Sequence, residues 1–178
     1  MTDEVYINKI ARDFGISLAD FGVGFVRSAT KNNPLTKVGY GTIKTNMVTA
    51  GINCSTSELD SVYQTAAWPL WEELLSQAHI ILGKMKWTEN IYDCDDFARA
   101  KKALMSLLFG LTDIGEVYGK VYNKDTGAFE WYHYFNVAIT SGNQVYLHES
   151  ITGESVLVKK GEPMILGNWR YEFLSARF

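Results

Sequence analysis

Three stretches of the chain space their apolar residues as the buried face of an α-helix does, and they cover residues 7–25, 69–82 and 94–109. Two glycines interrupt the first stretch, so we expect a broken or kinked helix there. The second stretch begins at a proline and the third is followed by a glycine, which are typical residues of helix starts and ends. Lys101 falls on the apolar stripe of the third helix, and we expect its amine to reach solvent.

The period of the apolar residues changes to two after the third helix, which predicts β-strands. Turn residues at 124–127 and 141–143 separate the first three of these runs. Strands are expected over residues 116–123, 129–140, 144–149, 156–158 and 170–175.

Helices followed by strands indicate an α+β fold, with an N-terminal helical half packed on a C-terminal antiparallel β-sheet. Residues 31–57 are rich in glycine, threonine, asparagine and serine, which predicts a loop with a short helix around 45–51. Another helical pattern opens at Ser57, a residue that favours helix starts. The chain is therefore expected to be mostly helical as far as Gly110.

The length of 178 residues is enough for one well-buried domain. We expect a single domain over 1–178, in which 1–60 form a variable N-terminal helical and loop region and 61–178 form the core. Apolar residues make up 47% and charged residues 21%, which are the proportions of a folded globular protein. A net charge of −3 gives no reason to expect nucleic acid as a partner.

Signals for secretion, membrane insertion and metal binding are missing from the sequence. No basic segment precedes an apolar run near the start, and no apolar stretch approaches 18 residues. Cys54 and Cys94 are too few for a disulfide framework, and we expect two thiols in a cytoplasmic protein. Zinc ligands at their usual spacing and glycine-rich phosphate loops are both missing, so no metal and no cofactor is expected.

The strongest functional signal is a thiol at a helix start, followed along the chain by an imidazole and a carboxylate on strands. These residues are Cys94, His133 and Glu149. If 141–143 form a three-residue hairpin loop, Phe135 lies opposite Glu149. His133 and Glu149 then share one face of the sheet as diagonal neighbours, while the side chain of the neighbouring His148 points to the other face.

Each of these residue types has a role in thiol chemistry. Cys94 would attack an acyl carbon, His133 would accept and return the proton, and Glu149 would orient the imidazole. The backbone N–H of Cys94 and the side chain of Asn90 are candidates for stabilising an oxyanion. Trp87 and Trp131 border the site segments and are candidates for a substrate cleft.

Structural interpretations stand beside these functional ones. A cysteine in an apolar helix is often a small buried residue, so Cys94 also fits a purely structural role. Cys54 lacks comparable partners, and His79 lies within an apolar helical stripe; we expect both to be structural.

The sequence words that carry the candidate site resemble a known superfamily. They are YDCDDFA at 92–98, HYFNVAI at 133–139 and VYLHE at 145–149. In these words the chain is similar to papain-like and transglutaminase-like cysteine peptidases, above all compact bacterial and phage-type members and the peptidase-like domain of some mushroom agglutinins. The relatives have Pro-Gln after the acid, where this chain has Ser150-Ile151.

The resemblance implies a papain-like core and a Cys94–His133–Glu149 triad that hydrolyses amide bonds in peptides or proteins through a thioester, with no cofactor. Acyl transfer to an amine is one alternative that it leaves open. An inactive binding or structural module of phage or bacterial origin is another, and a phage protein would be associated with the virion.

Overall fold

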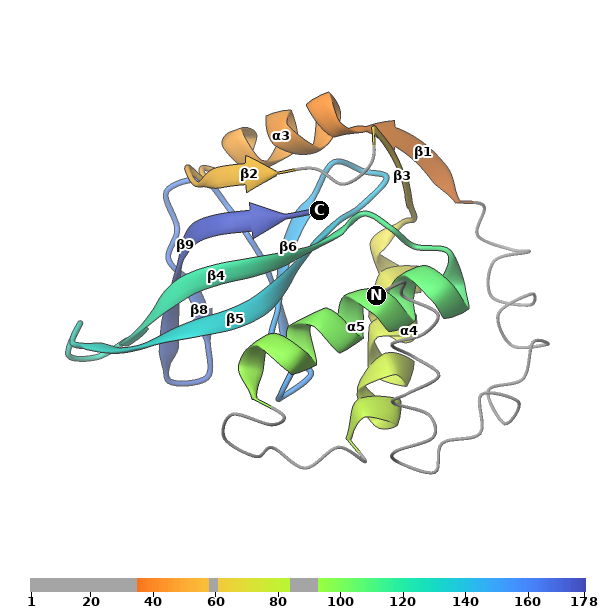
Figure 1. Cartoon of the computed structure of the whole chain (residues 1–178). Coiled ribbons are helices and arrows are strands. Elements are labelled where there is room, and N and C mark those ends of the chain that lie inside the picture. The colour runs from red at the N-terminus through yellow and green to blue at the C-terminus, as the bar shows by residue number, and fades with distance from the viewer. Residues whose placement is uncertain (1–34, 58–60, 84–92) are drawn as a thin grey trace.

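Figure 1 shows the computed structural model of the chain, in which residues 35–57, 61–83 and 93–178 are described. The predicted helix at 7–25 and the candidates Trp87 and Asn90 lie outside these ranges. No helix of the described part combines the length and the apolar character that crossing a bilayer takes.

Strands outnumber helices from the beginning of the described part. In chain order the first elements are β1 (Thr36–Gly39), α3 (Tyr40–Thr49), β2 (Ser55–Ser57), β3 (Val62–Thr65), α4 (Trp68–Leu82) and α5 (Cys94–Phe109). They are followed by β4 (Ile114–Asn123), β5 (Phe129–Ile139), β6 (Val145–His148), β7 (Ser155–Leu157), β8 (Met164–Leu166) and β9 (Trp169–Arg177).

The strands form two sheets of unequal size. The larger has seven strands in the order β2-β9-β4-β5-β6-β7, with β8 paired to β9, and the smaller is the antiparallel pair β1-β3. Within the larger sheet β2 runs parallel to β9, and the other pairs are antiparallel. The sheet is therefore mixed, and β9 lies second from one edge, between β2 and β4 (Figure 1).

This architecture corrects the predicted fold class. An N-terminal helical half over an antiparallel sheet is wrong, because three strands lie before α4 and one of them joins the main sheet in parallel. The loop expected over 31–57 contains two of these strands, β1 and β2. The helix expected to open at Ser57 is wrong for residues 62–65, which form β3. The division into 1–60 and 61–178 stays a prediction.

The core consists of two clusters of buried side chains. One lies where α4 and α5 pack together and against the sheet, and it includes Trp71, Leu104 and Ile114. The other includes Phe135 and Tyr171 on the sheet. In Figure 1, α5 lies beside β5 and α4 packs against α5, which brings the start of α5 close to the strands that carry the site.

Helix α5 has the predicted bounds, and its sequence explains both ends. Asp93 has extended backbone angles as the N-cap, and Asp95 and Asp96 place negative charge in the first turn, where the helix dipole favours it. Gly110 ends the helix with a φ of 70°, a conformation that glycine adopts without steric cost. The sequence therefore fixes Cys94 in the first turn.

The predicted pairing of β5 with β6 is confirmed. Asn136 lies opposite His148 and Ile139 opposite Val145, as a three-residue loop at 141–143 requires. The backbone N–H of Thr140 donates to the carbonyl of Gln144 at 2.9 Å and closes this hairpin.

Candidate functional site

Cys94, His133 and Glu149 come together in the folded chain. Nε2 of His133 and Oε2 of Glu149 are 2.7 Å apart, and the His133 ring also hydrogen-bonds the Cys94 side chain. Since Nε2 faces the carboxylate, Nδ1 is the ring nitrogen left for the sulfur. Cys94 is half-buried, whereas His133 is 8% and Glu149 2% exposed, so the thiol is the accessible end of this chain of groups.

Glu149 is held by more than the imidazole. The Tyr171 hydroxyl donates to its Oε2 at 3.1 Å, and the backbone N–H of Ile151 donates to its Oε1 at 3.0 Å. Its backbone N–H donates to the carbonyl of Glu154, and its carbonyl accepts from the N–H of Gly153, both at 2.8 Å. Both carboxylate oxygens thus have donors, as a buried carboxylate requires.

These neighbours stabilise the protonated form of His133. Burial by itself lowers the pKa of an imidazole, but the hydrogen bonds to Cys94 and Glu149 and the negative charge of both raise the pKa of His133 to about 9. His133 is therefore an imidazolium at neutral pH. An imidazolium beside a thiol, together with a helix N-terminus, favours the thiolate form.

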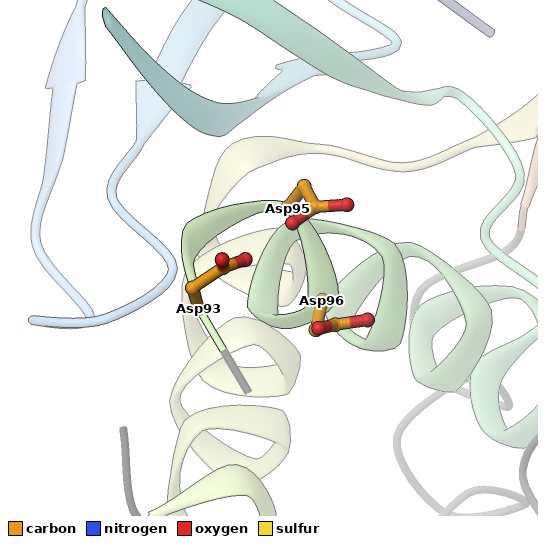
Figure 2. Close-up of side chains that lie close together, drawn as sticks. All are labelled: Asp93, Asp95 and Asp96. Atoms are coloured by element: carbon orange, nitrogen blue, oxygen red, sulfur yellow. The ribbon is translucent and has the colours of Figure 1, made fainter. Parts of the chain in front are cut away.

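A cluster of three carboxylates surrounds the same helix start. Figure 2 shows Asp93, Asp95 and Asp96 around the first turn of α5, and their oxygens lie within 4.8 Å of one another. The hydrogen bond with Asp93, burial and the neighbouring charges raise the pKa of Asp95 to about 6, against the opposing charge of Arg99. Oxygen donors of this kind suit hard cations such as Ca²⁺. Their negative charge also opposes the thiolate.

Of the other sequence candidates, Cys54 and Trp131 lie in the described part of the chain. Cys54 is a half-buried free thiol, and burial raises its pKa, as expected of a structural cysteine. Trp131 is 40% exposed, two residues before His133 on β5, and its ring meets that of Trp169 edge to face at a centroid distance of 4.8 Å. Asn90 and Trp87 are outside the described residues.

Two functional groups were not predicted from the sequence. Tyr171 lies on β9, and only the β4–β9 pairing brings it to Glu149. Lys101 does not reach solvent as predicted, because it is 0% exposed. The sequence signal for this burial is the position of Lys101 on the apolar stripe of the helix, because residues on that stripe face the core.

Comparison with known proteins finds likeness at the level of the fold. No family model and no curated protein matches the chain. Among solved structures, a PSL1a–E64 complex matches with a TM-score of 0.56 and 17% identity, covering 80% of this chain and 51% of that one. A Polyporus squamosus lectin bound to the human-type influenza-binding epitope Neu5Acα2-6Galβ1-4GlcNAc matches with a TM-score of 0.54 and 17% identity. That match covers 80% of this chain and 49% of the lectin, so the chain spans about half the length of both structures.

These findings correct the expected family. The structures that share the fold are named as a lectin and as PSL1a, and neither is named as a peptidase or a transglutaminase. Assignment to the papain-like and transglutaminase-like cysteine peptidases of bacteria or phages is therefore not upheld. Amide hydrolysis, acyl transfer, an inactive papain-like module and a peptide substrate all rested on that resemblance, and they lose their support with it.

Proposed function

We propose that Cys94, His133 and Glu149 form a reactive-thiol site, in which the Cys94 thiolate bonds to an electrophilic carbon of a ligand, a carbon–oxygen bond of that carbon gives up its electron pair to the oxygen, and the oxygen takes the proton from His133. The observation that carries the proposal is His133, which hydrogen-bonds Cys94 and lies 2.7 Å from Glu149. In the proposed site His133 holds the proton that leaves the thiol, and Glu149 orients the imidazolium.

The surroundings of the thiol support the proposal. Cys94 lies in the first turn of a 16-residue helix, where unpaired backbone N–H groups favour an anion. The PSL1a structure that shares the fold is described as a complex with E64, so we propose E64 as a ligand with which to test binding to this chain. We further propose that the protein works in a reducing compartment such as the cytoplasm, where both thiols stay free.

Alkylation of the folded protein by iodoacetamide, followed by mass spectrometry of each cysteine, tests the proposal. An ordinary thiol with a pKa near 8.5 is less than about 1% ionised at pH 6, so a preformed thiolate should react roughly tenfold faster or more. Cys54 is an internal reference in the same molecule, since burial raises its pKa. The proposal fails if Cys94 is labelled no faster than Cys54 at pH 6.

Variants of the two partners separate the proposed site from simple exposure. His133→Ala should slow labelling of Cys94 at pH 6 to the rate of an ordinary thiol, and Glu149→Gln should slow it less. Labelling of Cys54 should stay unchanged in both variants, which shows that the fold is kept. Unchanged labelling of Cys94 in folded His133→Ala would mean that the imidazole plays no part.

A second proposal is carbohydrate binding by an aromatic surface next to this site. The lectin that shares the fold is described with a bound sialylated trisaccharide. The surface consists of Trp131, which is 40% exposed, and Trp169, whose ring centroid lies 4.8 Å from that of Trp131. Sugar rings stack their C–H faces on exposed aromatic rings, and such patches often mark binding sites.

Titration with Neu5Acα2-6Galβ1-4GlcNAc, followed by NMR shifts of the tryptophan ring signals, tests this second proposal. Binding should shift the Trp131 and Trp169 signals and be lost in Trp131→Ala. Val48→Ala is a matched control, because Val48 is also a large exposed apolar residue, at 62%, but lies on α3. Equal binding by both variants, or no shift at millimolar trisaccharide, would rule out this surface.

A further inference from the structure

Helix α5 carries a buried lysine, Lys101, that the proposed thiol site does not use. Lys101 follows Cys94 by seven residues, which is two helical turns, so both side chains leave the same side of the helix. Lys101 is 0% exposed, and within the described residues its Nζ has no hydrogen-bond partner. A buried ammonium is costly, so its neighbours decide what it does.

The charged and titratable groups that interact with Lys101 lie on α4, on β6 and in the loop that follows β6. Burial lowers its pKa to about 7, against the opposing effect of the Glu149 carboxylate beyond the end of β6. Burial also lowers the pKa of His79 on α4 and of His148 on β6, and the charge of Lys101 lowers both further. The strands β4 and β5, which also pack on α5, contribute no charged group to the interactions found for Lys101 in the described part of the chain.

The two imidazoles are neutral neighbours with capacity to accept. Nδ1 of His148 lies 2.8 Å from the Ser155 hydroxyl, and its Nε2 is buried without a partner in the described structure. His79 hydrogen-bonds the backbone of Ser150, while its Nδ1 is likewise buried and unpaired among the described residues. Glu149 lies in the chain between His148 and Ser150, and it is the acid whose charge acts on Lys101 in the described part of the chain.

We propose that Lys101 is a positioning residue of the thiol site, whose buried positive charge, two helical turns from Cys94, favours the anionic form of Cys94. The inference rests on the proposed reactive-thiol function. Two turns of helix rise by roughly 10 Å, and a unit charge at that distance through protein shifts a titration by on the order of one pH unit. Removing the charge should move proton loss at Cys94 to higher pH.

The test is the pH profile of Cys94 alkylation by iodoacetamide between pH 4 and 9, with the His133 ring signals followed by NMR in the same samples. In Lys101→Met the acid side of the alkylation profile should move up by roughly one pH unit. The His133 titration, near pH 9, should stay in place, because Lys101 with a pKa of about 7 has already lost most of its charge there. Lys101→Arg keeps the charge and should restore the alkylation profile. Lys101→Gln is a second uncharged variant in case the first does not fold.

Lys102→Met is the matched control. It removes the same charge from the next residue, whose Nζ donates to the backbone carbonyl of Arg177 at the surface, and it should leave both curves unchanged. If the uncharged Lys101 variants fold and their curves overlay those of the wild type, Lys101 is not a positioning residue. The same holds if Lys102→Met shifts the curves equally.

The experiment also separates this inference from the function on which it rests. If wild-type Cys94 reacts no faster than Cys54, the reactive thiol itself fails, and the Lys101 inference falls with it. If wild-type Cys94 reacts fast and the uncharged variants leave its profile unchanged, only the role of Lys101 fails.

Discussion

Asp113 makes the stability of this protein depend on pH, and the effect can be isolated with one substitution. Its side chain is 0% exposed, and in the described structure neither carboxylate oxygen has a hydrogen-bond partner. Burial raises its pKa from 3.8 to about 8. The folded protein therefore binds a proton here that the unfolded chain releases once the pH exceeds about 4.

The sign and the size follow from linkage. A group whose pKa is raised in the folded state favours folding at low pH, and stability falls as pH rises from about 4 to about 8. Each pH unit between the two pKa values costs about 1.4 kcal/mol, so the full loss is at most on the order of 5 kcal/mol. Asp113→Asn is neutral at every pH and close in shape to the protonated acid, so it should remove this part of the dependence.

Urea unfolding of the wild type and of Asp113→Asn at pH 5 and pH 8 measures the difference. The backbone N–H of Asp113 donates to the carbonyl of Gln64, and its carbonyl accepts from Ile139, so the residue stays anchored in the variant. The variant should gain several kcal/mol over the wild type between pH 5 and pH 8. Asp125→Asn, at an exposed turn, should track the wild type. Parallel stability curves for wild type and Asp113→Asn would refute the reasoning.

Three further substitutions test other parts of the structure. Gly119→Ala places a Cβ 2.4 Å from the carbonyl oxygen of Glu172, so we expect the free energy of unfolding in urea to fall by about 1–3 kcal/mol. An unchanged free energy would mean that β4 and β9 move apart at this point without cost. Gly110→Ala forces an L-residue to a φ of 70° and should lower stability by about 1–2 kcal/mol, visible as a lower Tm; an unchanged Tm would contradict the left-handed helix end. Tyr171→Phe removes a donor to Glu149 and should cost about 1.5–3 kcal/mol at pH 7 by urea unfolding, and a neutral effect would mean that water replaces the hydroxyl.

Long elements with a clear period were predictable from the sequence, and short strands were not. Helix α5 has 16 residues with a capping acid and a terminal glycine, and each of these signals agrees with the others. Strand β2 has three residues, Ser55–Ser57, which is too short to show an alternation and too polar to resemble a strand. Its partner is β9, about 120 residues later, and a parallel pairing over that distance leaves no local signal.

The candidate site also has contacts that local sequence predicts and contacts that depend on distant parts of the chain. The approach of Glu149 to His133 followed from a hairpin with a short loop, so local register was enough to predict it. Tyr171 enters from a strand that pairs on the other side of β4, and its contact with Glu149 depends on the order of strands in the sheet. The prediction for Lys101 is wrong because a long basic side chain usually reaches water, whereas here the side chain is 0% exposed.

The position of β9 in the sheet has a consequence for how the chain folds during synthesis. Its neighbours β2 and β4 are complete long before residues 169–177 leave the ribosome. Until then β4 presents an open row of backbone donors and acceptors, and β2 has no strand to join. Pairings between residues so far apart in the chain are slow to form, and the waiting edge of β4 is a site for misassembly. A nascent chain stalled before residue 169 should therefore keep β2 and the edge of β4 open to other chains and to chaperones.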